Sequence, residues 1–303
     1  MFGSSETRSG VNLMRILVLG GDGMLGHKLL AHLGARHDVR VTLRRGVEDY
    51  ARYRLFDHNN AFSDVDVRSS DRLIEVLGQF RPEVVVNAVG VVKQRAEAKM
   101  AIPSIEINTL LPHRLALLTR AVGARLVHIS TDCVFSGRTG AYSETSASDA
   151  EDSYGKTKFL GEVSGPGCIT LRTSMIGREL SRKTGLLEWF LAQRGPIKGY
   201  ANAIFSGFTT QEMARVIERV VEQPANLHGL YHVSSEPISK YVLLTMLRDA
   251  LGTGIDISAD PEFRCDRSLR SDLFRRQFEY APPSWRAMVE ELVQEVKEGA
   301  NDL

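Results

Sequence analysis

The feature that most constrains the fold is a glycine-rich turn directly after a short apolar run. Residues 16–19 read Ile-Leu-Val-Leu, and residues 20–26 read Gly-Gly-Asp-Gly-Met-Leu-Gly. An apolar run bounded by glycine is typical of a buried parallel strand. Glycines at this spacing allow a tight turn, close approach of the backbone to a pyrophosphate and close helix packing. The helix N-terminus adds N–H groups for phosphates, so a dinucleotide is predicted to contact Gly20, Gly23, Met24, Leu25 and Gly26.

Strand-like and helix-like segments alternate after this turn. Leu25, Leu29 and Leu33 share one face of a predicted helix, and an apolar strand follows at 39–43. The alternation continues with a helix at 71–79, a strand at 84–86, a helix at 110–122 and a strand at 126–129. This order predicts an α/β fold with a doubly wound, parallel Rossmann sheet and right-handed crossovers. Beyond residue 170 the pattern is less regular, with helices expected at 186–193, 211–222, 240–251 and around 285–296.

The second predicted strand runs into two basic residues, Arg44 and Arg45. An NAD site usually has an acidic residue here that binds the ribose 2′-hydroxyl. A guanidinium instead binds a 2′-phosphate through paired hydrogen bonds. Arg44 therefore favours NADP(H) over NAD(H) as the cofactor.

Further cofactor contacts are expected where later strands end. Asp66 and Val67 follow the third predicted strand and are expected to flank the adenine. The fourth strand ends in Asn87, Ala88 and Val89, where small residues allow the backbone to approach a cofactor.

A tyrosine and a lysine are the candidate catalytic pair. Tyr154 and Lys158 are four residues apart and so share one face of a helix. A free tyrosine, with a pKa of about 10, is a poor acid–base group at neutral pH. An ammonium group nearby is expected to lower that pKa by stabilising the phenolate.

Two further residues are expected beside this pair. The fifth strand ends in Ser130 and Thr131, whose hydroxyls are positioned to hydrogen-bond a substrate carbonyl oxygen. Pro112, in the helix before that strand, lacks the N–H that would bond the carbonyl of Asn108. A water held by that carbonyl is predicted to relay protons to Lys158.

Composition excludes several other classes. The chain has 303 residues, with 38 basic and 37 acidic side chains, so no overall field attracts nucleic acid or an acidic membrane. It has no apolar run of about 18 residues that would span a membrane. Its three cysteines, Cys133, Cys168 and Cys265, indicate neither a disulfide framework nor a metal site, and they favour a reduced, cytoplasmic location. The polar start, 1–13, is predicted to be a flexible leader, and no metal ligand cluster is expected.

Taken together, these motifs resemble the extended short-chain dehydrogenase/reductase family, and within it the dTDP-4-dehydrorhamnose reductase branch. The resemblance spans nearly the whole chain from Arg15. It rests on the glycine turn and on the segments Ser-Thr-Asp-Cys-Val-Phe-Ser-Gly (130–137), Tyr-Gly-Lys-Thr-Lys (154–158), Leu-Arg-Thr-Ser (171–174), Gly-Leu-Tyr-His (229–232) and Arg-Ser-Leu (267–269).

This resemblance implies an activity and a division of the chain. The implied triad is Thr131, Tyr154 and Lys158, acting on the C4 ketone of a nucleotide-linked 4-keto-6-deoxy sugar. Tyr154 would protonate the forming alkoxide, Lys158 would hold the nicotinamide ribose, and Thr131 would orient the carbonyl. The cofactor domain would comprise 14–170 and 206–235. A smaller, interleaved substrate domain would comprise 171–205 and 236–303.

Departures from the branch leave the substrate open. The branch usually has tyrosine at the position of Cys133, and its Gly-x-Pro-Thr loop is Gly-Phe-Thr-Thr at 207–210 here. Residues 150–154 and 173–177 look more like reductases of UDP-linked 2-acetamido-6-deoxy-4-keto sugars.

Related activities remain as alternatives. A dehydratase would resemble Thr-Asp-Glu at residues 131–133, where Cys133 replaces the glutamate, so dehydration is disfavoured. An epimerase, or a non-catalytic, NADP-binding regulatory subunit, can share the Tyr154/Lys158 pair. Neither the nucleobase nor a homodimer is decided by the sequence.

Overall fold

The computed structural model describes residues 13–91, 100–181 and 183–301. The predicted leader at 1–13 falls outside this part of the chain except for its last residue. None of the helices in the described ranges is both long and apolar enough to cross a lipid bilayer.

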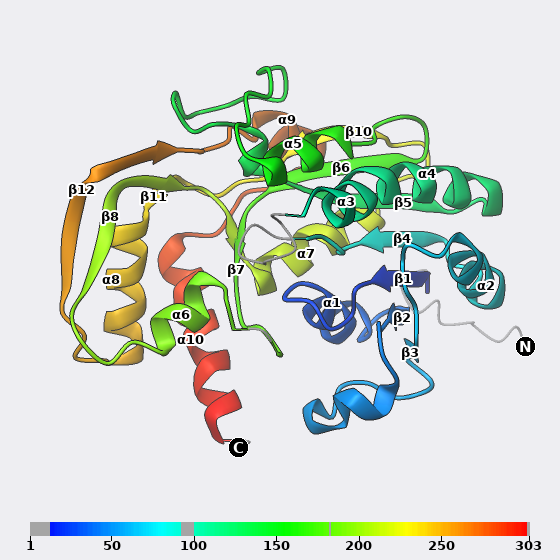
Figure 1. Ribbon diagram of the computed structural model, residues 1–303, viewed down its shortest axis with the longest axis horizontal. Helices are drawn as coiled ribbons and strands as arrows, with labels where there is room; N and C mark the ends of the chain where they lie inside the picture. Colours follow the sequence, from blue (N-terminus) through cyan, green and yellow to red (C-terminus); the bar gives the residue numbers. More distant parts are fainter. Residues whose placement is uncertain (1–12, 92–99, 182, 302–303) are drawn as a thin grey trace, which may run out of the picture.

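Seven parallel strands form the central sheet of the described chain, in the order β10-β6-β5-β4-β1-β2-β3 (Figure 1). Because the order reverses direction between β1 and β4, the ligand crevice expected of such a sheet lies at the carboxyl ends of these two strands. The predicted α/β, doubly wound fold is thus confirmed. The strands are β1 (Arg15–Leu19), β2 (Asp38–Thr42), β3 (Ala61–Phe62), β4 (Val84–Asn87), β5 (Arg125–Thr131), β6 (Cys168–Thr173) and β10 (Gly229–His232).

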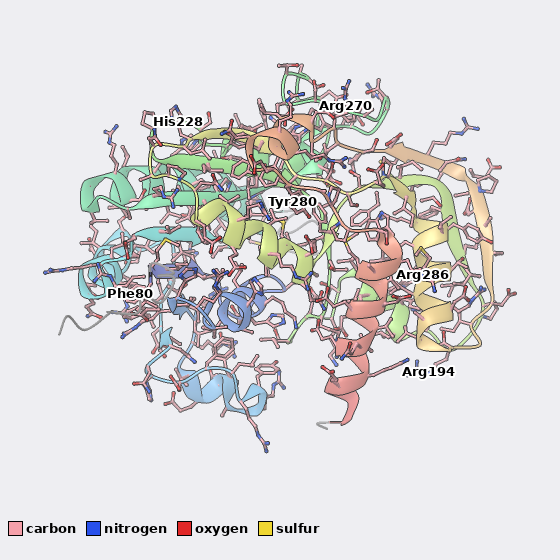
Figure 2. The ribbon with its side chains drawn as sticks, turned by 180° about the vertical axis from the view of Figure 1, so that it is seen from behind. Phe80, Arg194, His228, Arg270, Tyr280 and Arg286 are labelled. Atoms are coloured by element: carbon pink, nitrogen blue, oxygen red, sulfur yellow. The ribbon has the colours of Figure 1, made fainter. Side chains whose placement is uncertain are left out.

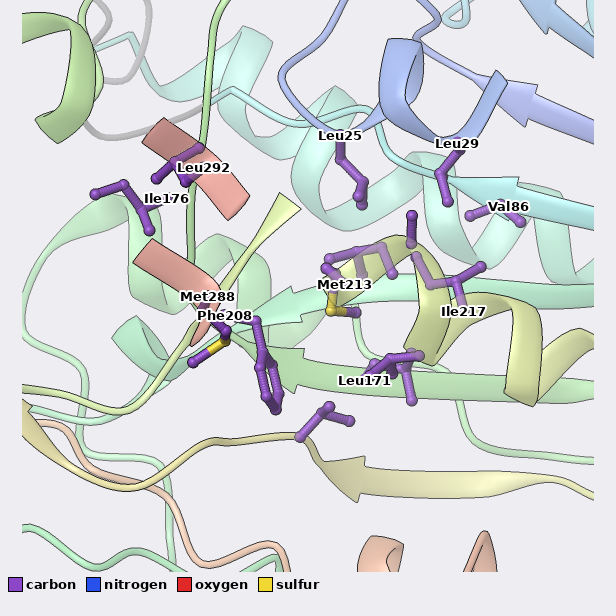
Figure 3. Packing of buried hydrophobic residues seen from close by; sticks show 14 of the residues in the cluster. Leu25, Leu29, Val86, Leu171, Ile176, Phe208, Met213, Ile217, Met288 and Leu292 are labelled. Carbon is purple, nitrogen blue, oxygen red and sulfur yellow. The ribbon is translucent and has the colours of Figure 1, made fainter. Parts of the chain in front are cut away.

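Helices cover both faces of this sheet. On one face α1 (Gly26–Leu33) and α7 (Thr210–Val221) pack over Val86 and Leu171, as the side chains of Leu29, Met213 and Ile217 show (Figure 3). On the other face α2 (Ser70–Phe80) and α4 (Leu111–Val122) bury a second apolar cluster. Alternate residues of each strand therefore face two different cores, which explains their continuous apolar sequence.

Short helical segments surround the expected crevice. The 3₁₀ helix η1 (Val47–Tyr53) follows β2, and the one-turn η4 (Asp132–Val134) follows β5. Before α4 lie α3 (Ala101–Ser104) and a π-helical segment, η3 (Ile105–Leu110). Pro112 lies in the first turn of α4, where its missing N–H is tolerated. The irregular winding of the helix at Asn108 is therefore confined to the π-helical segment η3, directly before α4.

A smaller lobe lies beside the central sheet. Its sheet has the order β11-β8-β12 and carries α8 against β8 (Figure 1). Tyr280 donates a 2.7 Å hydrogen bond to Glu212 of α7 and so ties the segment before α10 to the larger lobe (Figure 2). The helix α5 (Ser153–Leu160) packs against β5 and η4 of the larger lobe. The remaining elements are β7 (Met175–Ile176), α6 (Leu186–Leu191), β8 (Ile197–Phe205), β9 (Phe208–Thr209), β11 (Ile238–Ser239), α8 (Lys240–Leu251), β12 (Ile257–Asp266), α9 (Asp272–Gln277) and α10 (Trp285–Asn301).

The predicted division into 14–170 with 206–235 and 171–205 with 236–303 stays a prediction. The central sheet takes strands from the first pair of ranges, except that β6 continues past residue 170 to Thr173. The smaller sheet takes β11 and β12 from the last range and β8 from 171–205.

Candidate active site

The glycine turn connects β1 to α1 in the geometry that the sequence predicts. Gly20 has φ +84°, a conformation that residues with a side chain rarely adopt. A Cβ atom on Gly26 would lie 2.0 Å from the carbonyl oxygen of Gly20, so any side chain there would push α1 off the turn. The side chain of Leu25 is buried in the core, so the predicted contact of Leu25 with a cofactor is left to its backbone atoms. Gly185 comes close from the β7–α6 connection, since a Cβ there would lie 3.0 Å from the Met24 Cε.

A basic cavity lies beside the turn. It has a volume of about 300 Å³ and includes Arg44, as expected of a 2′-phosphate site. The sequence did not point to Arg52, which reaches the same cavity from η1. Val47 and Tyr50 are buried in the core and fix η1 there. The lining residues are Asp22, Arg44, Arg45, Asp49, Tyr50, Arg52, Tyr53 and Ser181.

The hydrogen bond with Arg68 is the largest influence that lowers the pKa of the Asp66 carboxyl. The charge of Arg44, which lines the cavity, acts weakly in the same direction. Val67 is partly buried against the core on the α2 side of the sheet. Neither residue lines the cavity, and Asp66 already has a cationic partner, so their contact with the adenine stays a prediction.

The polar groups at the end of β4 are used within the protein. Asn87 is fully buried, with its amide 3.1 Å from His128 Nδ1, and its Oδ1 accepts from the Val89 N–H at 3.2 Å. The Cγ2 of Val89 packs 2.9 Å from the place a Gly20 Cβ would occupy. Ala88 and Val89 therefore place only backbone groups and apolar side chains next to the glycine turn.

Asn108 also makes internal contacts. Its Oδ1 accepts from the Val91 N–H at 2.9 Å, and its amide donates to the Val91 carbonyl at 3.0 Å and to Thr157 Oγ1 at 3.3 Å. Gly161 packs against the backbone of Asn108, since a Cβ there would lie 1.9 Å from the Asn108 carbonyl oxygen. Asn108 thus joins the segment after β4 to α5, and a water relay at its carbonyl stays a prediction.

Thr131 and Tyr154 meet at the carboxyl end of β5. Thr131 lies close enough to Tyr154 for its hydroxyl to act against the rise in the pKa of that phenol. Asp152 caps α5 by accepting from the Gly155 N–H at 2.8 Å. A Cβ on Gly155 would lie 2.1 Å from the Cys133 carbonyl oxygen, so this glycine lets α5 approach η4.

Lys158, one turn along α5, is 3% exposed, and its ammonium donates to the Ile129 carbonyl at 2.6 Å. Burial lowers the pKa of Lys158 to about 8, against the opposing charge of Glu162. The sequence argument expected Lys158 to lower the pKa of Tyr154. Instead, desolvation raises that pKa, and the neighbouring Cys133 raises it further. Tyr154 is therefore protonated at neutral pH, which suits a proton donor.

A buried ion pair that the sequence did not indicate lies behind these residues. Arg172 and Glu162 have side chains only 4% and 8% exposed and are 2.7 Å apart. Ser130 donates to Glu162 at 2.7 Å, so its hydroxyl is engaged with this pair. The guanidinium of Arg172 also lies 3.2 Å from His232 Nε2. Thr131, rather than Ser130, is thus the strand-end hydroxyl that contacts Tyr154.

Other candidate chemistry finds less support. Burial raises the pKa of Cys133 to about 12, which keeps the thiol protonated and unsuited to nucleophilic attack.

Within the described ranges, His37, Glu218 and Glu222 are close enough together to ligate a metal. Arg36, however, pairs with both glutamates, at 3.0 and 3.3 Å. The two glutamates are therefore accounted for by ion pairs with Arg36, in the segment after α1.

Comparisons with known proteins agree with this architecture. The family model described as the RmlD substrate binding domain matches residues 14–298. A dTDP-4-dehydrorhamnose reductase from Aggregatibacter actinomycetemcomitans is 26% identical over 236 residues, which cover 74% of this chain and 74% of that protein. Methionine adenosyltransferase 2 subunit beta from Danio rerio is 30% identical over 257 residues, covering 78% and 73%. The crystal structure of a Bacillus anthracis dTDP-4-dehydrorhamnose reductase in complex with NADP has a TM-score of 0.77 at 20% identity, covering 93% and 99%.

Proposed function

The chain belongs to the family of the RmlD substrate binding domain, and on that premise we propose that it reduces the C4 ketone of a nucleotide-activated 4-keto-6-deoxy sugar with NADPH. The observation that carries this proposal is that Thr131, at the end of β5, and Tyr154, in the first turn of α5, lie close together at the carboxyl edge of the sheet, the same edge at which β1 leads into the glycine turn. The likeness to dTDP-4-dehydrorhamnose reductases supports it. The protein is thus an oxidoreductase of the extended short-chain dehydrogenase/reductase type, serving deoxysugar synthesis.

The residues present fit NADP(H). The turn at Gly20 and Gly26 has no room for side chains and leaves the N-terminus of α1 open to a pyrophosphate. Arg44, Arg45 and Arg52 share one cavity beside it, which suits a 2′-phosphate better than a bare ribose. NADPH, when bound, supplies the hydride.

The chain's own residues then handle the substrate oxygen. The Thr131 hydroxyl donates a hydrogen bond to the ketone and orients it. Tyr154, whose raised pKa keeps it protonated, gives its proton to the oxygen as negative charge develops there. Lys158 would bind the nicotinamide ribose and, as an ammonium, stabilise the phenolate left on Tyr154.

The identity of the sugar, the cellular location and the oligomeric state are part of the same proposal. The sugar is either dTDP-linked, as in 4-dehydrorhamnose, or a UDP-linked 2-acetamido-6-deoxy-4-keto sugar. We place the enzyme in the cytoplasm, where Cys133, Cys168 and Cys265 would remain free thiols as in the structure. A homodimer is a further proposal, to be tested by light scattering.

The test is NADPH oxidation with a panel of dTDP- and UDP-linked 4-keto sugars. Stoichiometric oxidation, with a Tyr154→Phe variant that binds NADPH normally but is inactive, supports the reductase. Sugar conversion without net NADPH consumption would point to an epimerase and contradict the proposal.

A second candidate has its own support, because a curated relative is methionine adenosyltransferase 2 subunit beta. As a regulatory subunit the chain would bind NADP(H) without turnover and would change the activity of a partner enzyme. Tight NADPH binding, no oxidation with any keto sugar and altered kinetics of an added methionine adenosyltransferase would favour this role.

A further inference from the structure

A segment from far along the chain contributes to the wall of the basic cavity. The other lining residues belong to the glycine turn or to residues 44–53, whereas Ser181 belongs to the connection between β7 and α6. Residues 177–181 and 183–185 of this connection are described. The side chain of Ser181 is exposed, so its hydroxyl is accessible to a ligand in the cavity. The reaction described above gives this segment no task.

The connection is held in place by two carboxylates close to it in the sequence. Glu188, 5% exposed in α6, accepts from Arg178 Nε at 2.8 Å and from the Glu179 N–H at 3.1 Å. The Glu179 carboxylate in turn accepts from the Gly185 N–H at 3.0 Å. These hydrogen bonds fix the backbone on both sides of Ser181.

The end of the connection is anchored as well. A Cβ on Gly185 would lie 3.0 Å from the Met24 Cε, so the connection comes close to the glycine turn here. The helix that follows, α6, buries Leu187 and Phe190 in the core. The position of Ser181 at the cavity is therefore set by the fold, which lowers the entropic cost of a contact with a ligand.

The cavity suits a phosphate group, and a hydroxyl adds a donor of a different kind. Guanidinium groups outnumber carboxylates among its lining residues, which include Arg44, Arg45, Arg52, Asp22 and Asp49. A phosphate has three strong acceptor oxygens, so it can bind guanidinium groups and still accept a hydrogen bond from a hydroxyl. NADH has no phosphate on its ribose 2′-hydroxyl and so offers no such acceptor.

We propose that the Ser181 hydroxyl donates a hydrogen bond to the 2′-phosphate of NADP(H), and that Glu179 is a positioning residue that holds Ser181 at the cavity. This inference rests on the proposed function, which places the 2′-phosphate there. Ser181 then adds to the selection of NADP(H) over NAD(H). Bound NADPH also ties the β7–α6 connection to the glycine turn, which NADH does not do.

The test is a fluorescence titration of each variant with NADPH and with NADH. Ser181→Ala should raise the Kd for NADPH by about threefold to tenfold and leave the Kd for NADH unchanged, as expected for loss of one hydrogen bond to a charged group at an exposed site. Ser258→Ala, an exposed serine of β12, is the matched control and should leave both values unchanged.

The role of Glu179 is tested by a conservative and a truncating variant. Glu179→Ala removes the acceptor of the Gly185 N–H and should raise the Kd for NADPH as S181A does. Glu179→Gln keeps an oxygen that accepts this bond and should restore most of the affinity. If E179Q binds NADPH as weakly as E179A, Glu179 does not act by positioning Ser181.

A second measurement follows the connection itself, without turnover. Trypsin cleaves after lysine, and Lys183 is an exposed residue of the connection. Saturating NADPH should slow cleavage at Lys183 more than saturating NADH does in the wild type. In S181A the two cofactors should slow cleavage equally. Equal protection by both cofactors in the wild type contradicts the inference.

Arg44→Ala separates failure of this inference from failure of the proposed cofactor site. If R44A loses NADPH selectively while S181A keeps both wild-type Kd values, the 2′-phosphate lies in the cavity but Ser181 does not bind it. If neither variant changes the preference for NADPH over NADH, the 2′-phosphate does not lie in this cavity, and both proposals are wrong. Equal weakening of NADPH and NADH by S181A also overturns the inference.

Discussion

The ammonium of Lys158 lies 2.6 Å from the carbonyl oxygen of Ile129, so its charge is held against β5. Because the side chain is 3% exposed, the folded protein bears a desolvation cost that lowers the pKa of Lys158 from 10.5 to about 8. In the unfolded chain the lysine stays protonated up to its ordinary pKa. The cost is therefore fully present below pH 8 and disappears as the pH rises toward 10.5.

We predict that Lys158→Met abolishes turnover yet raises the free energy of unfolding at pH 7, by up to about 3 kcal/mol. This gain over the wild type should shrink at pH 10, since wild-type stability rises as the folded state loses the Lys158 proton. Urea denaturation at the two pH values measures both differences. Lys156→Met, on the exposed side of the same helix, is the control and should change little. A gain of equal size at both pH values would show that packing, not charge burial, is responsible.

The second prediction concerns cofactor choice. Arg44 and Arg52 line the cavity beside the glycine turn, and hydrogen bonds to charged groups contribute about 1.5–3 kcal/mol each. Arg44→Ala should therefore raise the Kd for NADPH by roughly tenfold or more, with little change for NADH. Arg52→Ala should act in the same direction. Cofactor fluorescence titrations measure this, with Arg114→Ala on the outer side of α4 as control. Equal weakening of both cofactors by R44A would remove the 2′-phosphate assignment.

Helices, strands and motifs that depend only on residues close together in the sequence could be predicted. Periodicity gave α8 its observed limits, 240–251, and placed most of the other helices and strands that it predicted within about two residues, whereas many shorter elements were not predicted at all. The glycine turn and the Tyr154/Lys158 spacing also depend on nearby residues alone. Their functional roles stay predictions, although Thr131 and Tyr154 do meet.

Contacts between distant segments could not be predicted in this way. Arg52 reaches the cofactor cavity only because Val47 and Tyr50 anchor η1 in the core. The partner of Glu162 is set by β6 pairing with β5, and no local pattern reveals that pairing. The hydrogen bond of Lys158 to the Ile129 carbonyl depends on the same packing of α5 on the sheet.

The third prediction separates two glycines by their surroundings. A Cβ on Gly26 would meet the Gly20 carbonyl oxygen at 2.0 Å, whereas a Cβ on Gly78, on the exposed side of α2, would meet nothing within 4 Å. Gly26→Ala should therefore destabilise the fold and weaken NADPH binding, because α1 must shift from the turn. Gly78→Ala should stabilise it by about 0.5–1 kcal/mol, since alanine favours the helix. Thermal unfolding with and without NADPH measures both, and a G26A variant with wild-type affinity would contradict the role of the turn.

The last prediction tests the buried pair behind the site. Glu162→Gln leaves the Arg172 guanidinium, 4% exposed, without its counter-charge, which should cost about 3 kcal/mol or more of unfolding free energy. The exposed pair of Arg286 and Glu290 on α10 offers a matched control, since both side chains are more than half exposed. Glu290→Gln should change stability by at most about 0.5 kcal/mol.

The double variant Glu162→Leu/Arg172→Met shows whether charge or packing is responsible. It removes both charges while keeping apolar volume, so it should recover much of the stability that E162Q loses. Ser130 would then lose its acceptor, so recovery should be incomplete by about 1 kcal/mol. Guanidinium denaturation of the single and double variants gives these differences. A double variant less stable than E162Q would mean that the ion pair itself stabilises the fold, beyond neutralising Arg172.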